Sequence, residues 1–288
     1  MTLPLVVGVD GSDSCLTAVD WAVAEAVRHG LPLRLVYGSL WERYEGGLPA
    51  AGHERPSEQL LAEHIVASAA DRAARRATEV KVTTEILPED AADALVRAGD
   101  HAFALVTGSR GRGRLQGMLL GSVGLAVAAR APCPVVVVRG DAAGLAGTHE
   151  RILLGLGDAD TGAEAVRFAF REAEVRGCVL DVVRAWRRPA HDRIGDRAAA
   201  ADTHAQRASA LLDDLLGAAA TAYLHVRTRR ATPEGTAGRI LVDRSAAADL
   251  VIIGAGHRAG RFGLQLGRVS HTLLHHASCP VAVVPQRH

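Results

Sequence analysis

The amino-acid sequence repeats itself over most of its length. The segment that begins at Val6, VVGVDGSDSCLTAVDWAVAEA, aligns with the segment that begins at Leu153, LLGLGDADTGAEAVRFAFREA. The segments that begin at Leu105 and at Val251 align at nearly the same offset. A repeat of this size is a whole domain and not a short solenoid unit, and 288 residues suit two domains of about 150 residues each. We therefore predict two domains, residues 1–140 and 150–288, joined by a small, polar and flexible linker.

Each half alternates short apolar runs with longer segments of helical pattern. The runs of Val, Ile and Leu lack strict alternation with polar residues, which favours strands covered on both faces. Alternation of strands and helices predicts a parallel sheet with right-handed crossovers, and hence the α/β class. The first half has predicted strands at 5–9, 31–37, 80–87, 103–107 and 135–138, and predicted helices at 13–29 (capped by Ser12 or Asp13), 56–77, 89–98 and 121–130.

A glycine-rich loop, GSRGRGRLQGMLLGSV, lies between the fourth predicted strand and a predicted helix. Its G-x-x-G-x9-G-S pattern consists of Gly108, Gly111, Gly121 and Ser122. Three arginines lie between these residues: Arg110, Arg112 and Arg114. Glycine permits close approach of the backbone, and a helix start supplies unpaired N–H groups and a partial positive charge. The loop therefore predicts a phosphate site. A glycine- and arginine-rich surface turn is the alternative interpretation.

An aspartate follows the first predicted strand, in the run Gly8-Val9-Asp10-Gly11-Ser12. Ligands of such sheets bind at the carboxyl ends of the strands, where the strand order reverses. The Asp10 carboxylate can accept hydrogen bonds there from a ribose or a base amine. Asp-Gly is also a common turn pair, so a purely structural role for Asp10 stays open.

Composition argues against several classes of protein. The formal net charge is +1 with acids and bases interspersed, so we expect neither a nucleic-acid nor a membrane partner. The longest apolar runs have the length of strands, and the first residues, MTLPLVVGVD, lack the pattern of a signal peptide. The four cysteines show neither C-x-x-C nor zinc spacing, and we expect them to be buried in a reducing cytoplasm.

Other motifs are less specific. The run Gly254-Ala255-Gly256-His257-Arg258-Ala259 matches a dinucleotide fingerprint, but it follows the fourth predicted strand of its half instead of the first. His271 and His275 have the i, i+4 spacing of metal ligands, and His276 is adjacent; a polar helix face is the interpretation we favour, with no metal site. The sequence has no Walker lysine and no G-x-S-x-G elbow, and we identify no catalytic residue.

These motifs together resemble the universal stress protein family in its tandem two-domain form. The resemblance rests on V-G-V-D-G-S at 7–12, on the G-x-x-G-x9-G-S loop, and on A-P-C-P-V-V-V-V at 131–138. It implies two Rossmann-like domains, each with a five-stranded parallel sheet of order 3-2-1-4-5 and helices on both faces. In ATP-binding members the aspartate contacts the adenosine part, and the glycines and the serine hold the phosphates.

Carried over position by position, the resemblance implies an ATP site in the first half. Tyr37-Gly38, at the end of the second predicted strand, is the expected adenine wall. The implied binding residues are Gly8, Asp10, Gly38, Gly108, Ser109, Arg110, Gly111, Arg112, Gly113, Gly121, Ser122 and Val123. A Mg2+ ion can accompany the phosphates with few protein ligands.

The resemblance also implies a regulatory or stress-response role for the bound ATP. With no catalytic base evident beside the loop, we expect at most weak ATP hydrolysis. Two alternatives stay open: a slow ATPase or nucleotidyl transferase on the same fold, and an interaction module that binds no nucleotide. Family members often pair through their final strands, here 135–138 and 281–284, which implies pairing of the two halves within one chain and leaves a homodimer open.

The second half departs from the family pattern where the ligand would bind. Gly157 replaces Asp10 with Asp158 displaced by one position, His257 replaces Gly111, and Arg268 replaces Ser122. A side chain in place of Gly111 obstructs approach to phosphate, so we expect little ATP binding there; a phosphate contact from Arg268 is the alternative. The first half lacks one family aspartate, which the second half retains as Asp249, and we expect that residue to support the structure.

Overall fold

The computed structural model describes residues 2–40, 57–111, 120–157, 162–187, 197–255 and 266–286. The chain divides into two compact units, Met1–Val138 and Arg139–His288. The elements of the first unit are β1 (Leu5–Gly8), α1 (Asp13–His29), β2 (Leu33–Gly38), α3 (Ser57–Arg76), β3 (Val82–Leu87), α4 (Ala91–Ala98), the 3-10 turn η1 (Gly99–His101), β4 (Ala104–Gly108), α5 (Ser122–Arg130) and β5 (Val135–Val138).

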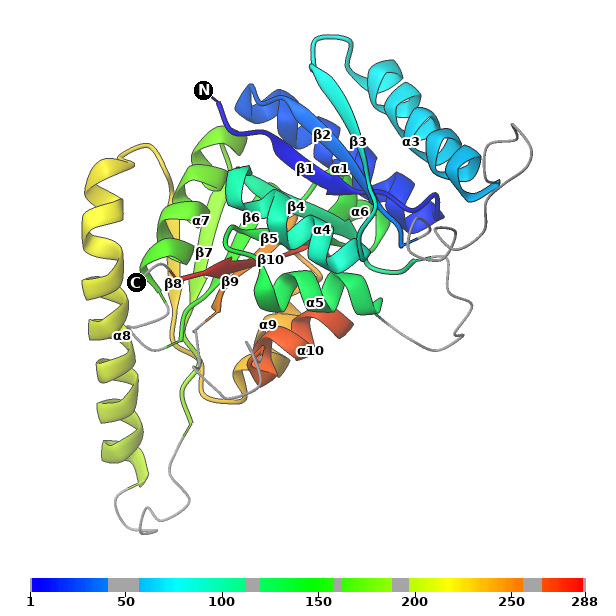
Figure 1. Ribbon diagram of the computed structural model, residues 1–288. Coiled ribbons are helices and arrows are strands. Elements are labelled where there is room, and N and C mark those ends of the chain that lie inside the picture. The colour runs from blue at the N-terminus through cyan, green and yellow to red at the C-terminus, as the bar shows by residue number, and fades with distance from the viewer. Residues whose placement is uncertain are drawn as a thin grey trace. The chain divides into compact units, whose positions relative to one another are not determined.

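The second unit repeats this succession of elements after one additional short helix (Figure 1). Its elements are α6 (Ala142–Ala146), β6 (Arg151–Gly155), α7 (Ala163–Arg176), β7 (Val179–Val183), α8 (Arg197–Ala222), β8 (Thr228–Ala231), α9 (Ala237–Ser245), β9 (Leu250–Ala255), α10 (Arg268–His276) and β10 (Val281–Pro285).

All strand pairs within each unit are parallel. In the first unit the hydrogen-bonded order is β3-β2-β1-β4-β5, with Val7 of β1 in register with Leu35 of β2 and Val106 of β4. In the second unit the order is β8-β7-β6-β9-β10. Both units therefore have the 3-2-1-4-5 topology that the family resemblance implies, and the chain is α/β as predicted. The order reverses between the first and fourth strands of each unit, which places a crevice at their carboxyl ends.

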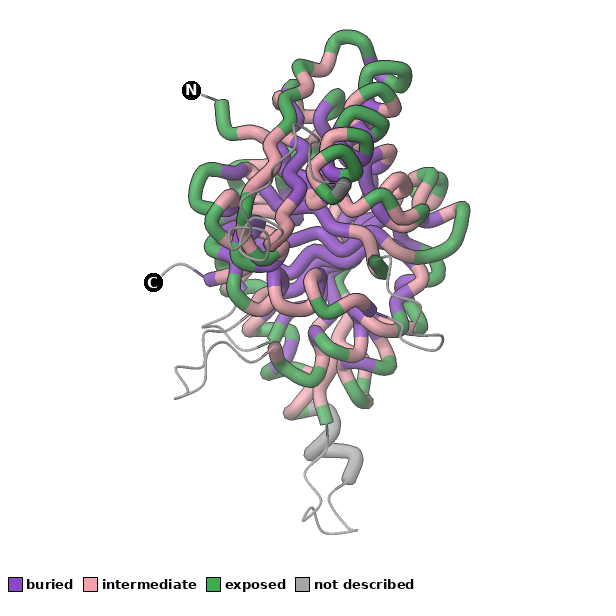
Figure 2. Tube along the Cα trace, turned by 45° about the vertical axis from the view of Figure 1, so that its right-hand side comes forward, coloured by how far each residue is buried: buried purple, intermediate pink, exposed green. Residues whose placement is uncertain are grey.

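The strands form the centre of each unit, and the helices cover them. Leu5, Val6 and Val7 of β1 and Leu105 and Val106 of β4 are almost completely buried, and Figure 2 shows long buried stretches of the chain in purple. The edge strands β3 and β8 contain no buried residue. In the first unit α1 packs on α3 and α4 packs on α5; in the second, α7 packs on α8 and α9 on α10. Covering helices explain why the strand sequences are apolar without alternation.

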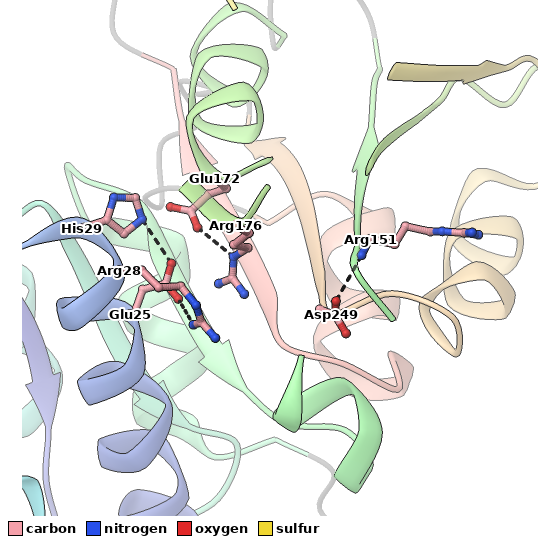
Figure 3. A network of polar contacts seen from close by, with 7 residues as sticks. All are labelled: Glu25, Arg28, His29, Arg151, Glu172, Arg176 and Asp249. Atoms are coloured by element: carbon pink, nitrogen blue, oxygen red, sulfur yellow. Dashed lines mark hydrogen bonds and ion pairs between the residues drawn. The ribbon is translucent and has the colours of Figure 1, made fainter. Parts of the chain in front are cut away.

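Helix α1 begins and ends as its sequence predicts. Ser12 is its N-cap, and the Ser12 hydroxyl accepts a hydrogen bond from the N–H of Cys15 at 3.2 Å. Gly30 ends the helix with φ of 62°, in the left-handed region. In the last turn Glu25 accepts a hydrogen bond from Arg28 at 3.0 Å and lies 3.2 Å from His29 Nε2 (Figure 3). Figure 3 also shows the matching turn of α7, where Arg176 donates to Glu172.

The predicted linker contains a short helix, α6, and belongs to the second unit. Asp141 caps helix α6 by accepting a hydrogen bond from the N–H of Gly144 at 2.9 Å, and its own N–H donates to the carbonyl of Ser278. Gly140 has φ of 112°, and a Cβ there would lie 2.2 Å from the Ser278 oxygen. The segment after β5 therefore docks against the turn that precedes β10, a contact that composition alone does not reveal.

The four cysteines are buried, as expected, and form no disulfide. Burial raises the pKa of the Cys279 thiol to about 12, and the nearby Asp249 carboxylate adds to this shift. Burial also raises the pKa of Cys15 and Cys178. These thiols are therefore protonated near neutral pH and behave as small apolar side chains.

Candidate functional site

A cavity of about 320 Å³ lies at the carboxyl ends of β1, β2 and β4 in the first unit. Helices α4 and α5, Cys15 of α1 and the loops that follow β1 and β4 contribute the rest of its wall. The lining residues are Gly8, Val9, Asp10, Cys15, Val36, Gly38, Ala91, Leu95, Thr107, Gly108, Arg110, Gly111, Leu120, Gly121, Ser122, Val123 and Gly124. The fold thus brings together, at the predicted crevice, residues from four separate stretches of the sequence.

Most residues predicted from the sequence to bind the ligand line this one cavity. Those that do are Gly8, Asp10, Gly38, Gly108, Arg110, Gly111, Gly121, Ser122 and Val123. Ser109 is not among the lining residues, and neither is Tyr37, which is buried beside Gly38 and Val36. Arg112, Gly113 and Arg114 lie outside the described residues.

Asp10 has the turn role that the sequence left open, and it also faces the glycine loop. Its Oδ1 accepts hydrogen bonds from the N–H of Ser12 at 2.9 Å and from the Ser12 hydroxyl at 2.7 Å. A Cβ at Gly111 would lie 2.9 Å from the other carboxylate oxygen, Oδ2. Glycine at position 111 therefore allows the loop to approach the Asp10 carboxylate, and the carboxylate lies at the cavity wall.

Several of the predicted glycines are also required by helix packing. A Cβ at Gly108 would lie 2.7 Å from the backbone of Ser14 in α1. A Cβ at Gly38 would lie 2.8 Å from Cα of Ala91, where α4 begins. We predicted these glycines for their approach to a ligand, and the structure adds a second reason, which is that helix starts pass directly over the strand ends.

Ser14 anchors the start of the glycine loop, and the sequence analysis missed it. The Ser14 hydroxyl accepts a hydrogen bond from the N–H of Arg110 at 3.1 Å and lies 3.4 Å from the Ser109 hydroxyl. The carbonyl of Ser109 accepts a hydrogen bond from the N–H of Gly121 at 2.8 Å. Ser109 therefore closes the loop on itself and on α1, which explains why it is not in the cavity wall.

The start of α5 has the features of an anion site. Gly121 is its N-cap, with extended backbone geometry, and it makes no side-chain hydrogen bond to the helix. The first turn, Ser122 to Gly124, lines the cavity. Uncapped N–H groups and the helix dipole favour a negative charge at this point. The exposed side chain of Arg110 adds positive charge beside it.

Another part of the wall is apolar. It is formed by the side chains of Val9, Val36, Ala91 and Leu95, and Leu120 adds to it next to α5. A cavity with an apolar part, an anion site and a carboxylate between strands suits a ligand with a flat apolar part and a phosphate group.

Comparison with known proteins decides the family. A sequence model of the universal stress protein family matches residues 1–139 and again 148–285. The chain belongs to the universal stress protein family. A universal stress protein of Mycobacterium tuberculosis is 30% identical over 302 residues, which cover 98% of this chain and 97% of that protein. A universal stress protein of Mycolicibacterium smegmatis is 30% identical over 291 residues, with the same shares covered.

A solved structure confirms the fold. A universal stress protein from Archaeoglobus fulgidus, 16% identical in sequence, superimposes with a TM-score of 0.69 over 99% of this chain and 98% of that one. The repeat found in the sequence is thus a tandem of two universal stress domains.

In the second domain the corresponding positions hold different groups. Arg268 is exposed and begins α10, whose N-cap, Gly267, also makes no side-chain hydrogen bond to the helix. The Arg184 guanidinium donates a hydrogen bond to the carbonyl of Gly157, at the end of β6 where the first domain has Asp10. Asp158 and His257 lie outside the described residues.

The family aspartate that only the second domain retains is structural, as predicted. The two carboxylate oxygens of Asp249 accept hydrogen bonds from the N–H groups of His149 at 2.9 Å and Arg151 at 3.1 Å, and Figure 3 shows the contact with Arg151. They tie the start of β9 to the start of β6. In the first domain Phe103 takes this place and packs against His29, with ring centroids 5.1 Å apart.

Among the residues that the structure describes, no helix is both long enough and apolar enough to span a bilayer.

Proposed function

We propose that this universal stress protein binds ATP in the cavity of its first domain and acts as a nucleotide-dependent regulator in a stress response. The observation that carries the proposal is the joint lining of one cavity by Asp10, the glycine loop and the uncapped start of α5. These groups fit the ligand, because N–H donors and Arg110 suit phosphates and the apolar wall suits a base.

In this proposal, different residues contact different parts of the nucleotide. The glycine loop and the first turn of α5 hold the phosphates, the Asp10 carboxylate accepts a hydrogen bond from the nucleoside, and Val9, Val36 and Leu95 contact the base. A Mg2+ ion accompanies the phosphates. The proposal includes domain bounds of 1–140 and 150–288, with the ATP motif intact only in the first, and a cytoplasmic location. Pairing through the final strands stays a prediction.

The test is a pair of matched glycine substitutions, Gly121→Glu and Gly267→Glu. Each replaces the N-cap glycine of the corresponding helix, α5 or α10. Among the described residues, a Cβ at Gly121 would have its closest contact at 3.6 Å, and one at Gly267 would have none within 4 Å, so both variants are expected to fold. A carboxylate in the phosphate site repels the ligand, and we expect Gly121→Glu to weaken ATP binding by about 100-fold or more.

Isothermal titration calorimetry measures the affinity, and circular dichroism checks the fold. Gly267→Glu serves as the control and is expected to bind ATP as the wild type does. Unchanged affinity in a folded Gly121→Glu variant would contradict the proposed site. Absence of binding and of thermal stabilisation by ATP in the wild type would instead favour an interaction module without nucleotide.

A further inference from the structure

One hydroxyl in the cavity wall has no hydrogen bond to the described part of the fold. Thr107 is 4% exposed, and its Oγ1 has no partner among the described residues. The same residue lines the cavity. A buried hydroxyl without a partner destabilises a fold, and native proteins keep few of them unless the group has another use.

The position of this hydroxyl places it beside the anion site. Thr107 is in β4, one residue before Gly108, and a Cβ on Gly124 would lie 3.4 Å from Thr107 Oγ1. Gly124 is in the first turn of α5, next to Ser122 and Val123. The hydroxyl and the uncapped N–H groups therefore lie at the same end of the cavity.

The fold does not need a hydroxyl here, as the sequence repeat demonstrates. Ile253 occupies the corresponding position of the second domain and is 3% exposed. It pairs with Val283 of β10, as Thr107 pairs with Val137 of β5. The same topology thus accommodates an apolar side chain at this position, so packing alone does not account for the hydroxyl of Thr107 in the first domain.

We propose that Thr107 is a ligand-binding residue, whose hydroxyl donates a hydrogen bond to an oxygen of the ribose-phosphate part of the bound nucleotide. This inference rests on the proposed function. A β-branched side chain in a buried strand has little rotamer freedom, so the donor is already held in place before the ligand arrives. The second domain, with Ile253, lacks this donor.

The experiment replaces the hydroxyl by a methyl group of similar size. In Thr107→Val we expect the Kd for ATP, measured by calorimetry, to rise about 5- to 20-fold, because one hydrogen bond to the ligand is lost. The melting temperature of the ligand-free variant is expected to equal or exceed that of the wild type, because a buried unpaired hydroxyl is removed. A role in folding alone would lower the melting temperature and leave the affinity unchanged.

A second pair of variants separates the hydrogen bond from changes in shape. Thr107→Ser and Thr107→Ala differ by one hydroxyl, and we expect Thr107→Ser to bind ATP more tightly. Ile253→Val, at the corresponding position of the second domain, is the matched control and should leave ATP binding unchanged. Equal affinities of the wild type, Thr107→Val and Thr107→Ala for ATP would overturn the inference.

Smaller ligands locate the acceptor and separate the two proposals. If Thr107→Val weakens the binding of adenosine as well, the acceptor of the hydrogen bond is in the ribose. If it weakens only the binding of ATP and AMP, the acceptor is a phosphate oxygen. If the wild-type chain binds none of ATP, AMP and adenosine, the proposed function fails and the inference fails with it. If the wild type binds and the valine variant binds equally, only the inference fails.

Discussion

At the carboxyl end of β1, Asp10 uses one carboxylate oxygen for the turn into α1 and directs the other towards Gly111. The first contact positions Ser12 as the N-cap, since the Ser12 N–H and hydroxyl both donate to Oδ1. The second oxygen, Oδ2, places negative charge at the cavity wall. One side chain therefore links the start of a helix to the proposed ligand site, and we expect substitutions at Asp10 to affect stability as well as binding.

Two substitutions at Asp10 separate these effects. Asp10→Ala removes the acceptor for the Ser12 N–H, and we expect it to lower the free energy of unfolding by about 1–2 kcal/mol. Asp10→Asn keeps an oxygen at this position, and we expect it to lower the free energy of unfolding by no more than about 0.5 kcal/mol. Urea denaturation without nucleotide measures both. Equal stability of the wild type and Asp10→Ala would show that the turn does not depend on this carboxylate.

At the scale of single elements, α5 and α10 begin alike and differ in the residues that follow. Both have a glycine N-cap without a side-chain bond. Helix α10 carries His271 and His275, whose rings stack with centroids 5.9 Å apart, and His276 follows. Burial lowers the pKa of His275, and the charges of His271, His276 and Arg139 lower it further. His271 and His276 are exposed, in agreement with the polar helix face that we predicted.

The lowered pKa of His275 makes a prediction about acid stability. The unfolded chain binds a proton at this histidine near pH 6.5, and the folded chain binds it only at lower pH. The contribution of His275 to the free energy of unfolding is therefore fully present above pH 6.5 and is lost as the pH falls below that value. We expect His275→Gln to lose less stability between pH 7.5 and pH 5.5 than the wild type, by urea denaturation. His271→Gln, which removes one neighbouring charge, should have a smaller effect of the same sign. Identical pH dependence in all three proteins would contradict this assignment.

At the scale of the whole molecule, two domains of one topology contain different groups at the corresponding crevice. The first has Asp10, Thr107 and Ser122; the second has Gly157, Ile253 and Arg268 at these positions. The cavity described above belongs to the first domain alone. Strand order and helix packing are shared because they depend on apolar residues common to both halves, whereas the binding that we propose depends on a few polar groups at the strand ends.

This asymmetry predicts one ATP per chain. In the second domain the absence of a carboxylate at the position of Asp10 and of a hydroxyl at the position of Thr107 both disfavour the ligand. Calorimetric titration of the full chain is expected to give a stoichiometry near one, and Gly121→Glu is expected to abolish the binding heat. Two equivalent sites per chain would show that Arg268 compensates for the missing groups.

The sequence by itself determined the two-domain repeat, the order and approximate bounds of the strands and helices, and most of the cavity lining. These features are encoded locally, by apolar runs, by caps such as Ser12 and Gly30, and by glycine spacing. Tertiary structure alone decided that Ser14 holds the glycine loop, that the segment leading into α6 docks against the turn before β10, and that the Thr107 hydroxyl has no hydrogen-bond partner among the described residues. Each of these depends on distances between residues far apart in the chain, which no local pattern records.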